Sequence, residues 1–173
     1  PKSSQRRVPA SFRWSRWTVA KYDIAIIGGG PGGYVAAIRA AQLGKHVVLI
    51  EKERLGGLCL NWGCIPSKAL LWNAEVVNLV RDAETYGISL DNVRFDMGKA
   101  IDRSREIVDQ MVKGVEFLLA KNGVTVINGE ASFVSPHTLG GSGLAETIEA
   151  PAVIIATGAR PRTLPGLATD GET

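Results

Sequence analysis

A glycine-rich turn over residues 28–33 constrains this chain more than any other segment. It reads Gly-Gly-Gly-Pro-Gly-Gly and follows an apolar, β-branched run at residues 22–27, which indicates a buried strand. Residues 34–43 are alanine-rich, contain no Gly or Pro and stop at Gly44, as is typical of a helix. Residues 46–50 indicate a second strand. A strand–helix–strand unit of this kind predicts a parallel sheet.

The turn also predicts a ligand, because Gly28, Gly30 and Gly33 match the pattern G-x-G-x-x-G. These glycines permit a tight turn, a close approach to a pyrophosphate and close packing of helix on strand. The helix N-terminus offers free N–H groups to phosphates. Glu51 ends the second strand, 21 residues after Gly30, where it can accept hydrogen bonds from a ribose. A plain glycine loop, and a surface ion pair of Glu51 with Lys52 or Arg54, are the alternatives, but this context favours dinucleotide binding.

The rest of the chain predicts further helices and strands of ordinary length. Together with the first unit they indicate an α/β, Rossmann-like domain with a parallel sheet and a small antiparallel β-meander. The expected elements are helices at 64–85 and 97–121, a loop at 86–96, strands at 124–127 and 151–156, and a meander at 131–150 with its turn at 140–143.

Charge is distributed unevenly along the chain. The first 20 residues carry five basic side chains and no acidic one, so the rest of the chain holds 15 basic and 17 acidic side chains. A nucleic-acid-binding function is therefore not expected, because it needs a basic face on the folded part. No apolar stretch approaches the roughly 18 residues of a membrane-spanning helix. The basic leader is interpreted as an unstructured extension or a truncated N-terminus, with an organellar transit peptide as the alternative.

Cys59 and Cys64 are the only two cysteines of the chain, and three interpretations compete for them. A structural disulfide closing so short a loop would constrain the unfolded chain by only about 2 kcal/mol, against nearly 5 for a loop of about a hundred residues. Zinc usually needs four ligands, and the only histidines, His46 and His137, form no cluster with the cysteines, so no metal site is expected. The third interpretation, a redox-active dithiol, is favoured.

The two sulfurs are expected to lie in different environments. Cys64 stands at or just before a predicted helix, whose dipole lowers the pKa of a thiol. Cys59 is placed on the preceding loop, where it is freer to meet a substrate. Lys68 follows Cys64 by one helical turn, on the same face, and is either a solvated lysine or a cation near the thiolate.

These residues resemble the flavin-dependent pyridine-nucleotide disulfide oxidoreductases. The resemblance covers residues 22 to about 166 and is strongest at 22–33, 56–71 and 156–161. The tract Cys-Leu-Asn-Trp-Gly-Cys-Ile-Pro-Ser-Lys, residues 59–68, is similar to the branch that oxidises dihydrolipoamide. Leu58 stands where many relatives have Thr, so a hydroxyl contact to the cofactor from this position is absent. Trp62 stands where Val is common, which is taken as variation within the branch.

The resemblance implies FAD at the glycine turn and a role for each cysteine. Cys59 would exchange with the dithiol substrate, and Cys64 would make the charge-transfer contact with the flavin. Lys68 would lie beside the flavin, and the backbone of Ala131 would meet the adenine. The full set of implied cofactor-binding residues is Gly28, Gly30, Gly33, Glu51, Lys52, Gly57, Lys68, Ala131, Thr157, Gly158 and Ala159.

The implied activity is FAD-dependent oxidation of protein-bound dihydrolipoamide to lipoamide, with electrons passing through the cysteine pair and FAD to NAD⁺. The implied partners are the lipoyl domain of a 2-oxoacid dehydrogenase complex or of the glycine cleavage system, and a second copy in a homodimer. A disulfide reductase of the mercuric or glutathione type, or a non-catalytic FAD-binding module, is the alternative.

The resemblance also implies an incomplete enzyme. Residues 1–20 are expected to be the basic leader, 21–166 the first part of an FAD-binding domain, and 167–173 the start of a further segment. The family's NAD domain, with a second glycine turn, and its interface domain, with a His–Glu pair, have no counterpart in the sequence, so the chain is expected to be a fragment that is inactive alone. The expected location is the cytoplasm, or the mitochondrial matrix if residues 1–20 are a transit peptide.

Overall fold

The computed structural model describes residues 19–160, 162 and 166. Its centre is a parallel sheet of four strands in the order β4-β3-β2-β8. These strands are β2 (Ile24–Ile27), β3 (Val47–Glu51), β4 (Thr125–Asn128) and β8 (Ala152–Ile155). Their parallel pairing confirms the predicted strand–helix–strand unit.

Two helices cover one face of the parallel sheet. Helix α1 (Pro31–Gln42) connects β2 to β3, and the long helix α4 (Met97–Lys121) packs beside α1 and precedes β4. Because side chains alternate along a strand, every second residue of β2 and β3 points to these helices. Ile26 and Leu49 thus share a buried cluster with Val108, Val112 and Leu119 of α4.

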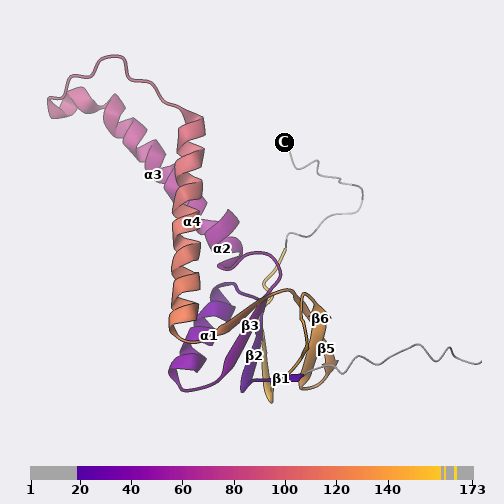
Figure 1. Cartoon of the computed structure of the whole chain (residues 1–173). Helices are drawn as coiled ribbons and strands as arrows, with labels where there is room; N and C mark the ends of the chain where they lie inside the picture. Colours follow the sequence, from indigo (N-terminus) through magenta and orange to yellow (C-terminus); the bar gives the residue numbers. More distant parts are fainter. Residues whose placement is uncertain (1–18, 161, 163–165, 167–173) are drawn as a thin grey trace, which may run out of the picture.

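A second sheet, also of four strands, covers the opposite face (Figure 1). It contains β1 (Val19–Lys21), β5 (Glu130–Ser135), β6 (Thr138–Ser142) and β7 (Thr147–Glu149) in the order β1-β7-β6-β5. Strands β5, β6 and β7 form the predicted antiparallel meander, and β1 adds to β7 in parallel. Leu139 and Ile148 of this sheet pack against Ala25 and Ile50 of the parallel sheet.

The remaining helices form an arm that leaves the sheets. The short helix α2 (Gly57–Trp62) leads into α3 (Cys64–Arg81), the 3-10 helix η1 (Ala83–Tyr86) follows, and the chain returns along α4. Figure 1 shows α3 crossing α4 at an angle, and both helices extend beyond the edge of the sheets. In the part of the chain that the structure describes, no helix is both long enough and apolar enough to cross a bilayer.

Several predicted boundaries are wrong. Helix α1 begins at Pro31 instead of residue 34, since proline suits the first helical turn. The α-helix predicted at 64–85 ends at Arg81, and a 3-10 turn completes it. Residues 19 and 20 belong to β1 and not to an unstructured leader, whereas residues 1–18 lie outside the described residues.

The turn predicted at 140–143 is only partly right. Residues 140–142 belong to β6, Gly143 begins the reversal between β6 and β7, and the chain also reverses at Pro136 and His137, between β5 and β6. Gly141 has φ +155°, and a Cβ there would lie 1.9 Å from the carbonyl oxygen of Glu130 on β5. The glycine therefore permits a close approach of two backbones within the sheet, which the sequence pattern does not distinguish from a turn.

Gly33 is expected to be essential for stability, because a Cβ there would lie 1.8 Å from the carbonyl oxygen of Gly28. We expect Gly33→Ala to lower the free energy of unfolding by about 3 kcal/mol or more, since the backbone cannot yield without separating α1 from β2. Urea denaturation followed by circular dichroism measures the loss. Gly32→Ala is the matched control, because its Cβ would meet only Ala156 at 3.8 Å. Equal stabilities of the two variants would contradict the packing argument.

Candidate functional site

The glycine turn lies at the carboxyl end of the parallel sheet, between β2 and α1. Gly28 has φ +104°, and its N–H donates to the carbonyl of Ile50 at 2.8 Å. A Cβ on Gly28 would lie 2.2 Å from the carbonyl oxygen of Ala156, just after β8. The turn thus fits between the ends of two neighbouring strands only because it lacks side chains.

The N-terminus of α1 has no capping side chain. Gly30 is the N-cap residue, Pro31 occupies the first turn, and the first turn contains no acidic residue. The first N–H groups of a helix have no intrahelical partner and carry a partial positive charge. This end of α1 is therefore suited to bind an anionic group such as a diphosphate.

Glu51 stands beside the turn at the end of β3. Its Oε2 accepts a hydrogen bond of 2.6 Å from the N–H of Gly29, and its Oε1 accepts one of 2.8 Å from the N–H of Glu53. These bonds hold the carboxylate between the glycine turn and the loop after β3. Each oxygen keeps further lone-pair capacity, so the carboxylate can also accept bonds from ligand hydroxyls.

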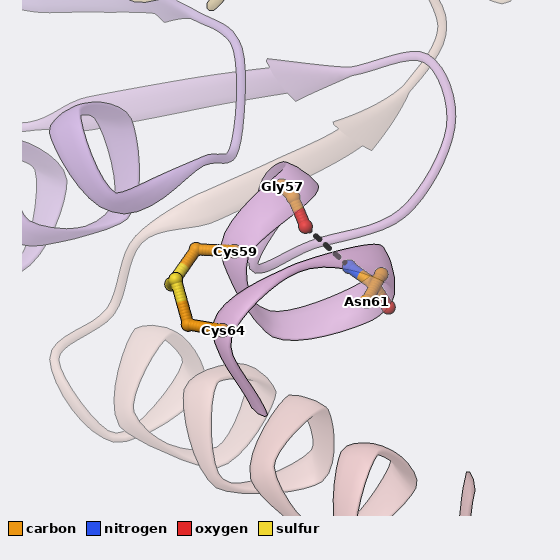
Figure 2. Close-up of a disulfide and its surroundings, with 4 residues drawn as sticks. All are labelled: Gly57, Cys59, Asn61 and Cys64. Carbon is orange, nitrogen blue, oxygen red and sulfur yellow. Dashed lines mark hydrogen bonds between the residues drawn. A yellow bond between two sulfur atoms is a disulfide. The ribbon is translucent and has the colours of Figure 1, made fainter. Parts of the chain in front are cut away.

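The two cysteines are joined by a disulfide next to this turn (Figure 2). Cys59 lies in α2, Cys64 is the first residue of α3, and their Cα atoms are 4.8 Å apart. Helix α2 is packed onto the glycine turn, because a Cβ on Gly57 would lie only 2.8 Å from the Cα of Gly30. The disulfide is therefore fixed in position relative to the N-terminus of α1.

One cleft of about 1060 Å³ joins these parts, a volume at the upper end of those of small-molecule and cofactor sites, about 300–1,000 Å³. Both cysteines line it, and so do Trp62 and Arg54. It also contains most of the cofactor-binding residues predicted from the sequence: Gly28, Gly30, Glu51, Lys52, Gly57, Ala131, Thr157, Gly158 and Ala159.

Two residues of the predicted set lie outside the cleft lining. Gly33 is buried behind the turn, where it serves the packing of α1 on β2. Lys68 is exposed on α3, one turn beyond Cys64. Within the described residues, no group of three or more His, Cys, Asp or Glu side chains is arranged to hold a metal ion.

Comparison with known proteins places the chain in a family of disulfide oxidoreductases. The family model for the pyridine nucleotide-disulphide oxidoreductases matches residues 22–173. The chain belongs to this family. It is 46% identical to a dihydrolipoyl dehydrogenase of Chlorobaculum tepidum over 161 residues, which are 88% of the chain and 33% of the relative.

Two further relatives give the same result. A dihydrolipoyl dehydrogenase of Zymomonas mobilis is 48% identical over 158 residues, 87% of the chain and 33% of the relative. One of Mycobacterium tuberculosis is 50% identical over 152 residues, 84% of the chain and 32% of the relative. The chain thus spans about a third of the length of the curated relatives that it matches.

The environment predicted for the cysteines of this family member needs a correction. Cys59 was expected on a loop, freer than Cys64, but it lies inside α2 and is half-buried, whereas Cys64 is exposed. The glycines on both sides of residues 58–62 suggest a loop, yet the segment folds into a short helix because it packs against α3 and α4. In this chain, exposure alone therefore does not favour Cys59 as the sulfur that meets a substrate.

Several residues around the cleft were not singled out by the sequence analysis. Asn61, between the two cysteines, is 1% exposed and donates to backbone carbonyls. Three ion pairs border the cleft: Lys52 with Glu130 at 2.9 Å, Arg54 with Asp109, and Arg160 with Glu53. Their partners are distant in sequence and show no spacing pattern, so only the folded chain reveals them.

The Arg54–Asp109 pair predicts a measurable pKa. The hydrogen bond from Arg54 holds the pKa of the Asp109 carboxyl below its ordinary value. We expect Arg54→Met to raise the pKa of Asp109, which carbon-detected NMR titration measures. The control is Arg103→Met, on the same helix as Asp109, which should leave this pKa unchanged. Since the folded-state pKa is depressed, the pair stabilises the fold above the ordinary carboxyl pKa. That contribution disappears as the pH falls through the folded-state pKa. An unchanged Asp109 titration in Arg54→Met would contradict the assignment.

Proposed function

We propose that this chain provides the FAD site and the redox-active disulfide of a dihydrolipoyl dehydrogenase. The observation that carries the proposal is the shared cleft, in which the Cys59–Cys64 disulfide, the uncapped N-terminus of α1 and the Glu51 carboxylate all take part. An anion site, a hydroxyl acceptor and a dithiol in one cleft suit a dinucleotide that exchanges electrons with sulfur. The naming of the relatives supports the same activity.

The residues of the cleft fit FAD. The side-chain-free turn at Gly28 and Gly30 and the N–H groups of α1 would hold the diphosphate. Glu51 would accept bonds from the ribose hydroxyls, and Lys52 would add a positive charge nearby. Ala131 on β5 would meet the adenine, and the segment Thr157–Ala159 after β8 would bind along the other side of the cofactor. Lys68, next to the flavin by family resemblance, would need to turn toward the cleft from its exposed position.

The cysteine pair would act by thiol–disulfide exchange. A thiolate of dihydrolipoamide attacks the sulfur of Cys59, the Cys59–Cys64 bond breaks, and Cys64 leaves as a thiolate. The second substrate thiol, after losing its proton to solvent, attacks the substrate sulfur of the mixed disulfide and releases Cys59 as a thiolate. The substrate is oxidised to lipoamide by two electrons, and the cysteine pair is reduced by two. When bound, FAD would accept this electron pair and return it as hydride to NAD⁺.

Helix α3 supports Cys64 as the leaving sulfur. Cys64 is the first residue of this helix, and neither a side-chain cap nor an acidic residue competes for the free N–H groups of the first turn. The helix dipole stabilises a thiolate at this position, and a thiol of lower pKa leaves faster. Cys59 is also in the first turn of a helix, but α2 has six residues against 18 in α3, so its summed dipole is smaller and Cys59 remains the better target for the attacking thiol.

The complete reaction would need parts of the protein beyond this chain. The chain spans about a third of its relatives, so we propose that NAD⁺ reduction, homodimer formation and docking of a lipoyl domain require the remaining length. The arm supports association with further protein, because it exposes Leu71 and Trp72 of α3 to 66% and 57%. Turnover of dihydrolipoamide with NAD⁺ by the isolated chain would contradict this division.

FAD binding tests the first half of the proposal. We expect the purified chain to bind FAD and Glu51→Gln to weaken binding about 30-fold, since a charged acceptor contributes about 1.5–3 kcal/mol. Quenching of flavin fluorescence measures the affinity. The control is Glu149→Gln, whose carboxylate pairs with Lys21 on the second sheet. The FAD site would be misassigned if Glu51→Gln bound as tightly as this control.

Reduction of the disulfide tests the second half. We expect excess dihydrolipoamide to reduce the Cys59–Cys64 disulfide of the FAD-loaded chain at least tenfold faster than glutathione does, because its second thiol resolves the mixed disulfide intramolecularly. Alkylation of the free thiols and mass spectrometry count the reduced cysteines, and the Cys59→Ser/Cys64→Ser double variant gives the background. Faster reduction by glutathione would favour a reductase of the glutathione type.

A further inference from the structure

The side chain of Asn61 lies between the two cysteines in sequence and fastens the backbone around them. Its Nδ2 donates to the carbonyl of Leu55 at 2.9 Å and to the carbonyl of Gly57 at 3.0 Å. Figure 2 shows the bond to Gly57, at the beginning of the short helix that carries Cys59. One buried amide thus connects the loop before α2 with the first and last turns of α2.

The orientation and burial of this amide are well defined. Carbonyl oxygens only accept hydrogen bonds, so the atom that faces both of them must be the donor Nδ2. Asn61 is 1% exposed, and its Oδ1 is buried without a partner in the part of the chain that the structure describes. Truncating the side chain removes this unpaired acceptor together with the two bonds, which makes a folded variant feasible.

Helix α4 fastens the same segment from outside. Arg105 donates to the backbone carbonyl of Asn61 at 3.0 Å, and buried Ser104 donates to that of Pro66 at 3.4 Å. The Asn61 carbonyl is near the C-terminus of α2, where carbonyls lack intrahelical partners. The carbonyls bound by these three side chains therefore bracket Cys59 and Cys64 on both sides.

We propose that Asn61 is a positioning residue that holds the reduced cysteines close enough to reform their disulfide. The inference rests on the proposed redox role of the cysteine pair and adds to it. In the oxidised chain the disulfide itself constrains α2 against α3. In the reduced chain that constraint is gone, and the hydrogen bonds of Asn61 hold α2 in the geometry in which the two sulfurs face each other.

The effect on the redox equilibrium follows from this difference. Without the Asn61 bonds the reduced segment gains conformational freedom, whereas the oxidised segment remains closed by its covalent bond. The substitution therefore favours the reduced form, and the equilibrium constant for disulfide formation falls. Two hydrogen bonds of ordinary net strength correspond to a fall of about tenfold. For a two-electron couple this is a shift of about 30 mV toward a more oxidising potential.

The test is the disulfide equilibrium of the full 173-residue chain in glutathione buffers. Mixtures of reduced and oxidised glutathione are equilibrated with the chain, quenched, alkylated and analysed by mass spectrometry. We expect half-oxidation of Asn61→Ala at a ratio [GSH]²/[GSSG] about tenfold lower than for the unsubstituted chain. Asn61→Ser can bond back to the Gly57 carbonyl four residues earlier, so it should show a smaller shift in the same direction.

Asn73→Ala is the matched control. Asn73 also donates an amide hydrogen to a backbone carbonyl between two helices, that of Ala100 at 3.4 Å, and accepts from Arg103 at 3.2 Å. Asn73 is on α3, nine residues after Cys64, and does not bond to the segment that carries the cysteines. Loss of its hydrogen bonds should lower the stability of the fold without changing the redox potential of the disulfide. Near-ultraviolet circular dichroism confirms that each variant is folded, and Asn61→Ser decides the question if Asn61→Ala does not fold.

The outcomes separate this inference from the proposed function. The inference is overturned if the equilibrium constants for disulfide formation of Asn61→Ala and Asn61→Ser are within about twofold of that of the unsubstituted chain, and also if Asn73→Ala shows an equal shift. The measurement needs neither FAD nor lipoamide, so the inference can hold even if the chain fails to react with dihydrolipoamide. A chain whose thiols form no disulfide at any glutathione ratio would overturn both proposals.

Discussion

The close approach of backbone segments at the glycines of the first turn is the constraint on which the site depends. Gly33 lets α1 pack against Gly28, Gly28 lets the turn pass the end of β8, and Gly57 lets α2 pack against Gly30. At each position a Cβ would meet backbone atoms at 2.8 Å or less. The glycines therefore bring three distant segments together at the carboxyl end of the sheet, where open α/β folds bind their ligands.

The cysteine pair acquires its geometry from this packing. Helix α2 is short, and short isolated helices are unstable in water, so its shape depends on the glycine turn below it and on Asn61 and Arg105 around it. Cys64 gains the free N–H groups of α3 because the chain restarts a helix immediately after Gly63. The glycine turn and the sulfur pair are thus one structural unit, as the proposed electron transfer between a nucleotide and the sulfurs would require.

Much of the fold could be predicted because it follows from local pattern. The long helix from Met97 to Lys121 was predicted with both ends, since its apolar stripe is regular and Asn122-Gly123 ends it. The errors arose where long-range contacts decide. Val19 and Ala20 become a strand only by pairing with β7, and the glycines at 140–142 continue a strand because β5 lies alongside. Neither pairing has a signal in the local sequence.

By itself the sequence determined the parallel sheet, the glycine turn, the placement of Glu51 at the end of β3 and the close spacing of the two cysteines in one motif. These depend on periodicity, on backbone freedom and on spacing along the chain, which are local properties. Only the tertiary structure decided that Cys59 lies in a helix, that Cys64 is the more exposed sulfur and that Asn61 fastens the segment between them. Burial and hydrogen bonding depend on neighbours distant in sequence, and those exist only in the folded chain.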